Sequence, residues 1–214
     1  MGRPRQHDES TRLALLAAAE RMIDADGPDA ASVRAVADAV GTTTRAVYSV
    51  FGSKDGMLEA LATRLFDFLV AAIDACERTD DPVVDLVEAS VSGFRRTALE
   101  HPALYSLVFL RVVPDLRFGA DFAESAGRAF GRLESLVRRL HEEGPLDAAG
   151  AGDASLAVHA LTEGLASMEL RGALAGTGDP EAVWRTSVRT LLDGFAGARG
   201  GRVVTGGSAD AGCG

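Results

Sequence analysis

A short run of polar side chains, spaced for one face of a helix, is the part of this sequence best suited to bind another molecule. The run follows Gly41 and comprises Thr43, Thr44, Arg45, Tyr48 and Ser49. Arg45 has the forked donors that pair with guanine, and a threonine methyl group can pack on the methyl group of thymine. Tyr48 and the nearby Lys54 suit phosphate oxygens, which fix a protein's register on DNA without reading bases. These residue types predict double-stranded DNA as the partner.

Two short helices joined by a glycine turn are predicted to carry this run. The apolar residues of the first helix recur at helical spacing, namely Val33, Val36, Ala37 and Val40. Ser32 suits the cap of that helix, and Gly41 follows it, where a left-handed residue is least costly for glycine. Thr43 suits the cap of the second helix, whose inner face carries Ala46, Val47, Val50 and Phe51. This is the helix-turn-helix arrangement, in which the second helix enters the major groove.

The charge of the protein supports a local DNA-binding surface. The full set of residues expected at that surface is Ser32, Arg34, Thr42, Thr43, Thr44, Arg45, Tyr48, Ser49 and Lys54. The formal net charge is −9, but residues 1–55 hold seven basic and eight acidic side chains, so the acidity lies mostly beyond them. Such a distribution excludes a general polyanion binder. The basic residues Arg3 and Arg5 suit an arm along a phosphate strand or in the minor groove, and the alternative is a solvated tail.

Composition indicates a soluble globular protein that works in the cytoplasm. Apolar residues make up 47% of the 214 residues and charged residues 25%. The sequence has no apolar run long enough to span a membrane and no signal peptide at its start. Cys76 and Cys213 lie far apart, so a structural disulfide is not expected.

No enzyme motif is found in the sequence. The G-x-S-x-G, P-loop and H-E-x-x-H patterns do not occur, and the four histidines lack paired metal spacing. We therefore expect neither catalysis nor a bound metal or cofactor. With an enzyme disfavoured in this way, the other alternative to a DNA-binding regulator is a helical small-molecule carrier or interaction protein without DNA binding.

Helical periodicity extends along the whole chain, so the predicted fold is all-α with about nine helices. A three-helix DNA-binding domain with its N-terminal arm is expected at residues 1–52, with its first helix from Asp8 or Ser10 to about Asp24. A long helix from Ser53 to Cys76, about 30 Å long, is expected to link it to the rest. The remaining helices are predicted at about 81–100, 103–110, 122–140, 154–175 and 180–198. Residues 53–198 then form a ligand-binding and dimerisation domain, and the glycine-rich residues 199–214 a disordered tail.

Aromatic and polar residues of the second domain are candidates for a mostly apolar ligand pocket. Its predicted lining is Phe66, Phe94, His101, Tyr105, Phe109, Phe122, His159, Glu163 and Met168. Pockets of this kind combine apolar walls with a few polar groups that orient the ligand. The alternative is that these aromatic residues are ordinary core packing.

The last two predicted helices are rich in small residues and also carry an apolar stripe. We expect them to form a two-fold interface between protomers, because a palindromic DNA site requires a dimer. The residues predicted at that interface are Gly164, Trp184, Val188, Leu191 and Phe195. The other interpretation is that a monomer buries the stripe internally.

The stretch from Ser32 to Leu58 resembles the TetR family of bacterial transcription regulators. The matching residues follow the family order and are Ala37, Gly41, Tyr48, Phe51, Lys54 and Leu58. The resemblance implies a homodimeric DNA-binding protein, commonly a repressor, that a small-molecule ligand releases from a palindromic operator. Residues 101–110 and 159–170 also resemble a subgroup with a tryptophan-x-x-x-histidine-glycine signature. The corresponding positions here are His159, Glu163 and Gly164, so only the glycine is kept.

Overall fold

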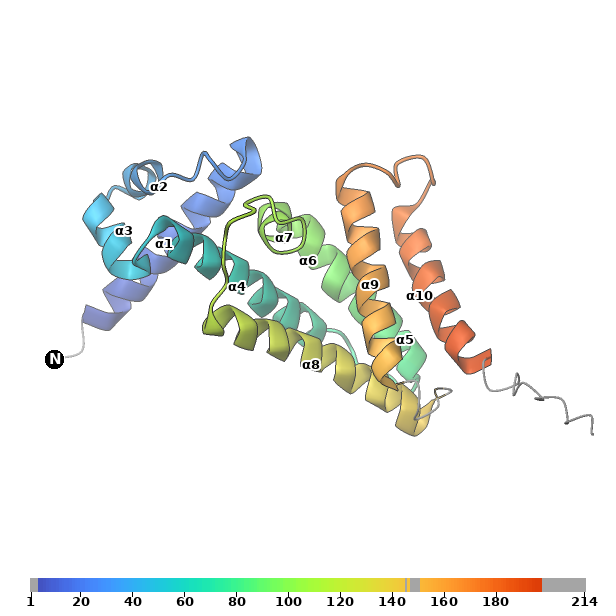
Figure 1. Ribbon diagram of the computed structural model, residues 1–214. Coiled ribbons are helices and arrows are strands. Elements are labelled where there is room, and N and C mark those ends of the chain that lie inside the picture. The colour runs from blue at the N-terminus through green and yellow to red at the C-terminus, as the bar shows by residue number, and fades with distance from the viewer. Residues whose placement is uncertain (1–3, 145, 147–150, 198–214) are drawn as a thin grey trace, which may run out of the picture.

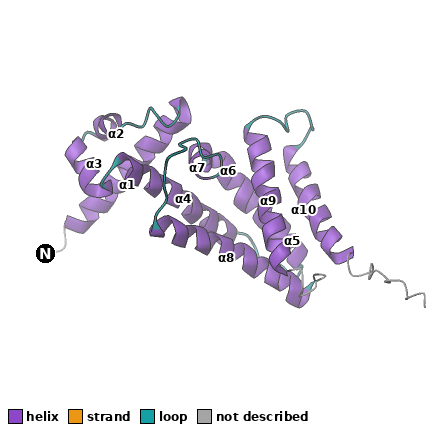
Figure 2. Cartoon of the chain, viewed as in Figure 1, coloured by secondary structure: helices purple, strands orange, loops and turns teal. Residues whose placement is uncertain are grey.

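The computed structural model describes residues 4–144, 146 and 151–197, and every regular element within these ranges is a helix (Figures 1 and 2). The N-terminal helices form a head at one end of the molecule, and the last two helices lie at the other end (Figure 1). The all-α prediction is confirmed. No helix within the described ranges has the length and apolar composition to cross a membrane.

The head consists of three helices followed by the start of a fourth. They are α1 (Pro4–Asp26), α2 (Val33–Val40), α3 (Thr44–Phe51) and α4 (Lys54–Asp74). Helix α1 begins earlier than the predicted start at Asp8 or Ser10, and proline suits the first turn of a helix because its fixed φ matches helical geometry. The proposed DNA-contacting arm thus lies partly in α1, and residues 1–3 lie outside the described residues.

The second domain continues from α4 through helices that partly surround it. They are α5 (Pro82–Glu88), η1 (Ala89–Arg95), α6 (Arg96–Glu100), α7 (Pro102–Val108), α8 (Ala120–Glu143), α9 (Ala151–Leu170) and α10 (Pro180–Gly197). Helices α5, η1 and α6 form one continuous rod whose middle is π-helical, a feature that the sequence pattern did not predict. Helix α9 ends earlier than the predicted residue 175. The proposed tail, residues 199–214, lies outside the described residues.

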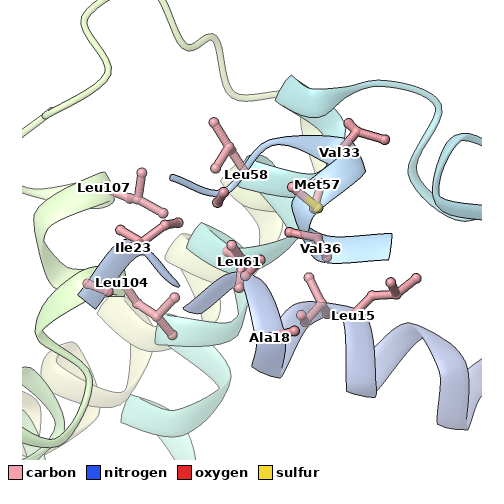
Figure 3. Packing of buried hydrophobic residues seen from close by; sticks show 14 of the residues in the cluster. Leu15, Ala18, Ile23, Val33, Val36, Met57, Leu58, Leu61, Leu104 and Leu107 are labelled. Carbon is pink, nitrogen blue, oxygen red and sulfur yellow. The ribbon is translucent and has the colours of Figure 1, made fainter. Parts of the chain in front are cut away.

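One hydrophobic core joins the head to the second domain. Leu15 and Ile23 of α1, Val36 of α2, and Met57 and Leu61 of α4 are buried together (Figure 3). Leu104 and Leu107 of α7 complete the same cluster. The first turns of α4 are therefore part of the head's core, and α7 of the second domain packs directly against the head.

A second core lies among the C-terminal helices, with Trp184 at its centre. The Trp184 and Val188 side chains are fully buried, and the core also holds Leu192, one helical turn further along α10. The prediction that Trp184 and Val188 form a surface between protomers is therefore wrong. Their stripe faces α5, η1 and α9 of the same chain, which agrees with the interpretation that a monomer buries it. Leu191 and Phe195 are half-buried at the edge of this core.

Partly buried ion pairs hold these helices in register. The Arg95 guanidinium donates to both carboxylate oxygens of Glu169, over 2.9 and 2.8 Å, and the indole N–H of Trp184 donates to Glu169 Oε2 over 2.8 Å. The hydrogen bond with Glu169 raises the pKa of Arg95 above its ordinary value, and burial acts in the opposite direction. Glu169 therefore ties η1 to both α9 and α10.

A second ion pair fixes α8 against α5. Burial acts to raise the pKa of Asp85, but hydrogen bonds from Thr79 and from Arg139 outweigh it, and the pKa lies below its usual range. Because the folded state holds this carboxyl group ionised, its contribution to stability is present above the unfolded-state pKa and is lost as pH falls through the lowered one.

We expect Glu169→Ala to lower the free energy of unfolding by about 3 kcal/mol, because it removes the acceptor of the buried Trp184 indole N–H and of the partly buried Arg95 guanidinium. Glu181→Ala is the matched control. Its carboxylate also contacts Arg95 but is 45% exposed, so the loss should be about 1 kcal/mol or less. Urea unfolding of both variants measures the difference, and equal losses would contradict this role for Glu169.

Candidate functional site

The helix-turn-helix unit is built by capping interactions at each helix end. Ser32 Oγ accepts the backbone N–H of Ala35 over 3.2 Å, and Thr43 Oγ1 accepts that of Ala46 over 3.2 Å. Gly41 adopts the left-handed conformation, with φ of 71°, and ends α2. The predicted caps and the predicted glycine turn are thus confirmed. Because each capping hydroxyl accepts the helix N–H, its own hydrogen remains available for donation to a phosphate oxygen.

The polar face of α3 is open to solvent. Val47 is fully buried against the head core, whereas Tyr48 is 52% exposed. The other residues proposed for DNA contact are also exposed or half-exposed, and they are Ser32, Arg34, Thr42, Thr43, Thr44, Arg45, Ser49 and Lys54. The structure therefore gathers all nine residues around α2, α3 and the start of α4.

The basic side chains of this face differ in their partners. Arg34 faces Asp38 one turn along α2, with Nε 3.9 Å from a carboxylate oxygen and both side chains mostly exposed. Within the described residues, Arg45 and Lys54 have no carboxylate within 4 Å. In the second domain, by contrast, arginines such as Arg95 and Arg139 are paired with carboxylates. Arg45 and Lys54 thus keep their charge available for an anionic partner.

Two close contacts set the orientation of α3. Ser53 Oγ accepts the N–H of Gly56 over 2.9 Å and begins α4 directly after the corner at Gly52, where φ is 75°. A Cβ atom on Gly56 would overlap the carbonyl oxygen of Phe51, the last residue of α3. The angle between α3 and α4 therefore depends on a glycine at position 56.

The structure holds a cavity of about 430 Å³ among α4, η1, α7, α8 and α9. Six of the nine residues proposed as a ligand-binding set line it, namely Phe66, Phe94, Phe109, Phe122, His159 and Glu163. Phe118, Phe130 and Arg111 also line it and were not predicted as ligand-binding residues from the sequence. Phe118 falls in an irregular segment and Arg111 has a positive φ of 48°, so no helical pattern points to either.

Three residues of the proposed pocket lie elsewhere. Met168 is 41% exposed on the outer face of α9. Tyr105 is buried, and its hydroxyl group bonds to the carbonyl oxygen of Glu163 over 2.8 Å and to Ser167 over 2.9 Å. Burial is the main cause of its raised pKa. Tyr105 therefore supports the cavity wall from behind, because it holds the backbone of α9 at Glu163.

His101, the third of these residues, lies where the second domain meets the head. Its Nδ1 is 2.7 Å from Glu20 Oε1 of α1, and its ring stacks on Phe68 with ring centroids 4.1 Å apart. The Arg64 guanidinium lies over the Phe68 ring, 5.0 Å from its centroid. Its Nη1 is 3.6 Å from Glu20 Oε2. We call Glu20, Arg64, Phe68 and His101 the interdomain joint. It connects α1 of the head to α4 and to the turn before α7.

The chain matches two family models, one in its N-terminal part and one in its C-terminal part. Residues 15–61 match "Bacterial regulatory proteins, tetR family", and residues 87–191 match "Tetracyclin repressor-like, C-terminal domain". The first range covers the helix-turn-helix unit and the start of α4, and the second covers most of the helices around the cavity. A search of curated proteins gives no match.

Solved structures with the same fold cover nearly the whole chain. A protein of unknown function from Rhodococcus sp. RHA1 has 24% identity and a TM-score of 0.72, covering 87% of this chain and 95% of that one. The TetR family transcriptional regulator PfmR from Thermus thermophilus has 23% identity and a TM-score of 0.62, covering 84% and 97%. A TetR variant from Acinetobacter baumannii AYE, solved in complex with minocycline, has 24% identity and a TM-score of 0.60, covering 86% and 96%.

We expect Gly56→Ala to destabilise the protein by about 1–3 kcal/mol, because the new methyl group forces the end of α3 away from α4. Gly127→Ala is the control on the exposed face of α8, where a Cβ atom meets nothing within 4 Å. There the better helix propensity of alanine should stabilise by up to about 1 kcal/mol. Thermal unfolding of both variants measures the difference. A Gly56→Ala protein as stable as the wild type would contradict the close contact between position 56 and the carbonyl oxygen of Phe51.

Proposed function

Because the chain belongs to the TetR family of bacterial transcriptional regulators, we propose that it is a dimeric, sequence-specific repressor that a small molecule releases from a palindromic operator. Regulators of this family bind DNA and are not enzymes. The observation that carries the proposal is the exposed face of α3, on which Arg45 and Tyr48 project from a capped helix that is anchored in the head core by Val47. An operator in bacterial DNA places this activity in the cytoplasm.

The residues around α3 divide between base reading and phosphate binding. Arg45 suits a bidentate contact with guanine, and the methyl groups of Thr43 and Thr44 suit thymine. Lys54 and Tyr48 suit phosphates, as do the hydroxyl groups that cap α2 and α3. Paired recognition helices, about 34–36 Å apart, would occupy successive major-groove faces of an inverted repeat.

The exposed face of α9 supports a revised dimer interface. Leu156, Ala160, Gly164 and Met168 recur every four residues and are all exposed, with Leu156 at 62% and Met168 at 41%. Residues at this spacing form one stripe along a helix. We place this stripe, in place of Trp184 and Val188, against a second copy of the chain across a two-fold axis. Gly164 belongs both to the interface predicted from the sequence and to this revised interface.

Helix α4 and the interdomain joint provide the route from cavity to DNA. Phe66 and Leu69 of α4 line the cavity, and Met57 and Leu58 of the same helix are buried in the head. A ligand that shifts α4 therefore moves α3, and the joint transmits the same motion to α1. Release requires that the ligand prefer the shifted arrangement, typically by about 1–3 kcal/mol.

Selection of bound duplexes from a random DNA pool, at physiological salt, tests the proposed function. We expect enrichment of an inverted repeat with half-sites about one helical turn apart. Arg45→Ala should relax the preference at one base position, at a cost of about 1–3 kcal/mol. Lys54→Ala should weaken binding to all sequences alike and reduce the salt slope by about one.

Arg138→Ala is the control for these variants, because it removes the same charge from an exposed position on α8, away from the head. It should leave selection and affinity unchanged. If folded protein enriches no sequence, the regulator proposal fails, and a helical small-molecule carrier becomes the better description.

Gly164→Glu tests the dimer. A Cβ atom at Gly164 meets nothing within 4 Å in the protomer, so the fold should tolerate the change. The glutamate would place a charge within the proposed interface, and we expect sedimentation equilibrium to show a monomer where the wild type is a dimer. Gly127→Glu, equally unobstructed on α8, should remain a dimer. A dimeric Gly164→Glu protein would exclude this face of α9.

A further inference from the structure

Three polar side chains in the described lining of the cavity, Ser90, Thr162 and Glu163, offer hydrogen-bond acceptors to a ligand. Two hydroxyl groups line it, and each donates its hydrogen to its own helix: Ser90 Oγ to the carbonyl oxygen of Leu86 over 2.8 Å, and Thr162 Oγ1 to that of His159 over 3.0 Å. Both side chains are buried, so this arrangement is fixed by the low-dielectric surroundings. Their remaining lone pairs accept hydrogen bonds from a ligand.

Glu163 is the one carboxylate among the lining residues that the structure describes. His159, one turn earlier on α9, places Nε2 3.7 Å from Glu163 Oε2 and is charged only when protonated. That separation exceeds a normal hydrogen bond. The Glu163 side chain is 38% exposed, so water can hydrate the carboxylate while the cavity is empty. An incoming cation would replace this water.

Six of the nine phenylalanines of the protein line the same cavity as this carboxylate, namely Phe66, Phe94, Phe109, Phe118, Phe122 and Phe130. Some of these rings meet at steep angles, whereas Phe118 and Phe122 are stacked with centroids 3.8 Å apart. Phe66 and Phe122 are 72° apart with centroids 5.1 Å apart, and the Phe130 ring is at 87° to that of His159, 5.7 Å away. Rings inclined in this way present both faces and edges to the cavity, and the faces attract positive charge.

Arg111 is the one basic side chain other than His159 in the described lining, and it lies at the rim. The residue is exposed, and its guanidinium faces the Phe118 ring at 5.9 Å while Nη2 approaches the carbonyl oxygen of Leu116 at 3.5 Å. A negatively charged ligand anchored on Arg111 would share the cavity with the phenyl rings and with the Glu163 carboxylate. The interior therefore disfavours anions.

We propose that the cavity takes a lipophilic organic cation, whose positive charge is bound by Glu163 and the aromatic walls and whose N–H or O–H groups, where present, donate to Ser90 and Thr162. This inference rests on the proposed function, because it names the chemical class of the molecule that releases the operator. The net charge of −9 favours the approach of the same class of ligand. The cavity volume of about 430 Å³ accommodates one drug-sized molecule.

Calorimetric titration with two ions of the same shape and opposite charge tests the proposal on the full chain. Tetraphenylphosphonium should bind, and tetraphenylborate should bind at least about tenfold more weakly. Glu163→Gln should weaken tetraphenylphosphonium binding by about tenfold or more. Glu134→Gln removes the same charge from an exposed position on α8 and should leave the affinity unchanged.

A neutral apolar dye, N-phenyl-1-naphthylamine, distinguishes a variant that has lost its affinity for the cation from one that has lost the cavity itself. Glu163→Gln protein should bind this dye as the wild type does, which shows that the cavity is intact. The proposal is overturned if tetraphenylborate binds more tightly, if tetraphenylphosphonium does not bind, or if Glu163→Gln leaves its affinity unchanged.

The effect of the ligand on DNA binding is measured in a separate experiment. Tetraphenylphosphonium should weaken binding to the selected operator for the wild type and not for Glu163→Gln. If operator binding is confirmed but no cation binds, the ligand class is wrong and the regulator remains. If the cation binds but no operator is found, the cavity assignment stands and the regulator fails.

Discussion

The packing of α4 is the constraint on which the rest of the structure depends. Met57, Leu58 and Leu61 near its start are buried among α1, α2 and α7, while Phe66 and Leu69 further along form a wall of the cavity. One continuous helix thus belongs to two packed regions. Because packed interiors are dense and resist deformation, neither region can rearrange around this helix without strain in the other.

The surroundings of α4 strengthen this dependence. Gly93 lets η1 approach it so closely that a Cβ atom would lie 2.8 Å from Ile73 Cγ1. On the opposite side of the rod, the Arg95–Glu169 pair fixes η1 to the C-terminal helices. Near the middle of α4, at Arg64 and Phe68, the interdomain joint packs an aromatic stack against Glu20. The helix is therefore held along its length by contacts of different kinds, apolar, steric and ionic.

The head could be predicted from sequence almost residue by residue, because its determinants are local. Ser32, Gly41 and Thr43 act within three or four positions of themselves, and such signals survive any tertiary arrangement. The cavity could be predicted only in part. His101, Tyr105 and Met168 belong to apolar or aromatic stretches like those of the residues that line the cavity. Only the packing of helices distant in sequence determines which of these residues face the cavity. The π-helical segment and the inward direction of Trp184 likewise depend on neighbours that periodicity does not reveal.

The position of Trp184 has an experimental consequence. It is the only tryptophan in the protein, it is fully buried, and its ring centroid is 6.4 Å from that of Phe94 in the cavity wall. Selectively excited indole emission therefore comes from a single site in the C-terminal core. The emission spectrum reports on the cavity side of the molecule, and it is largely blind to local opening of the helix-turn-helix unit. Comparing it with far-ultraviolet circular dichroism, which senses every helix, would reveal whether the two halves unfold together.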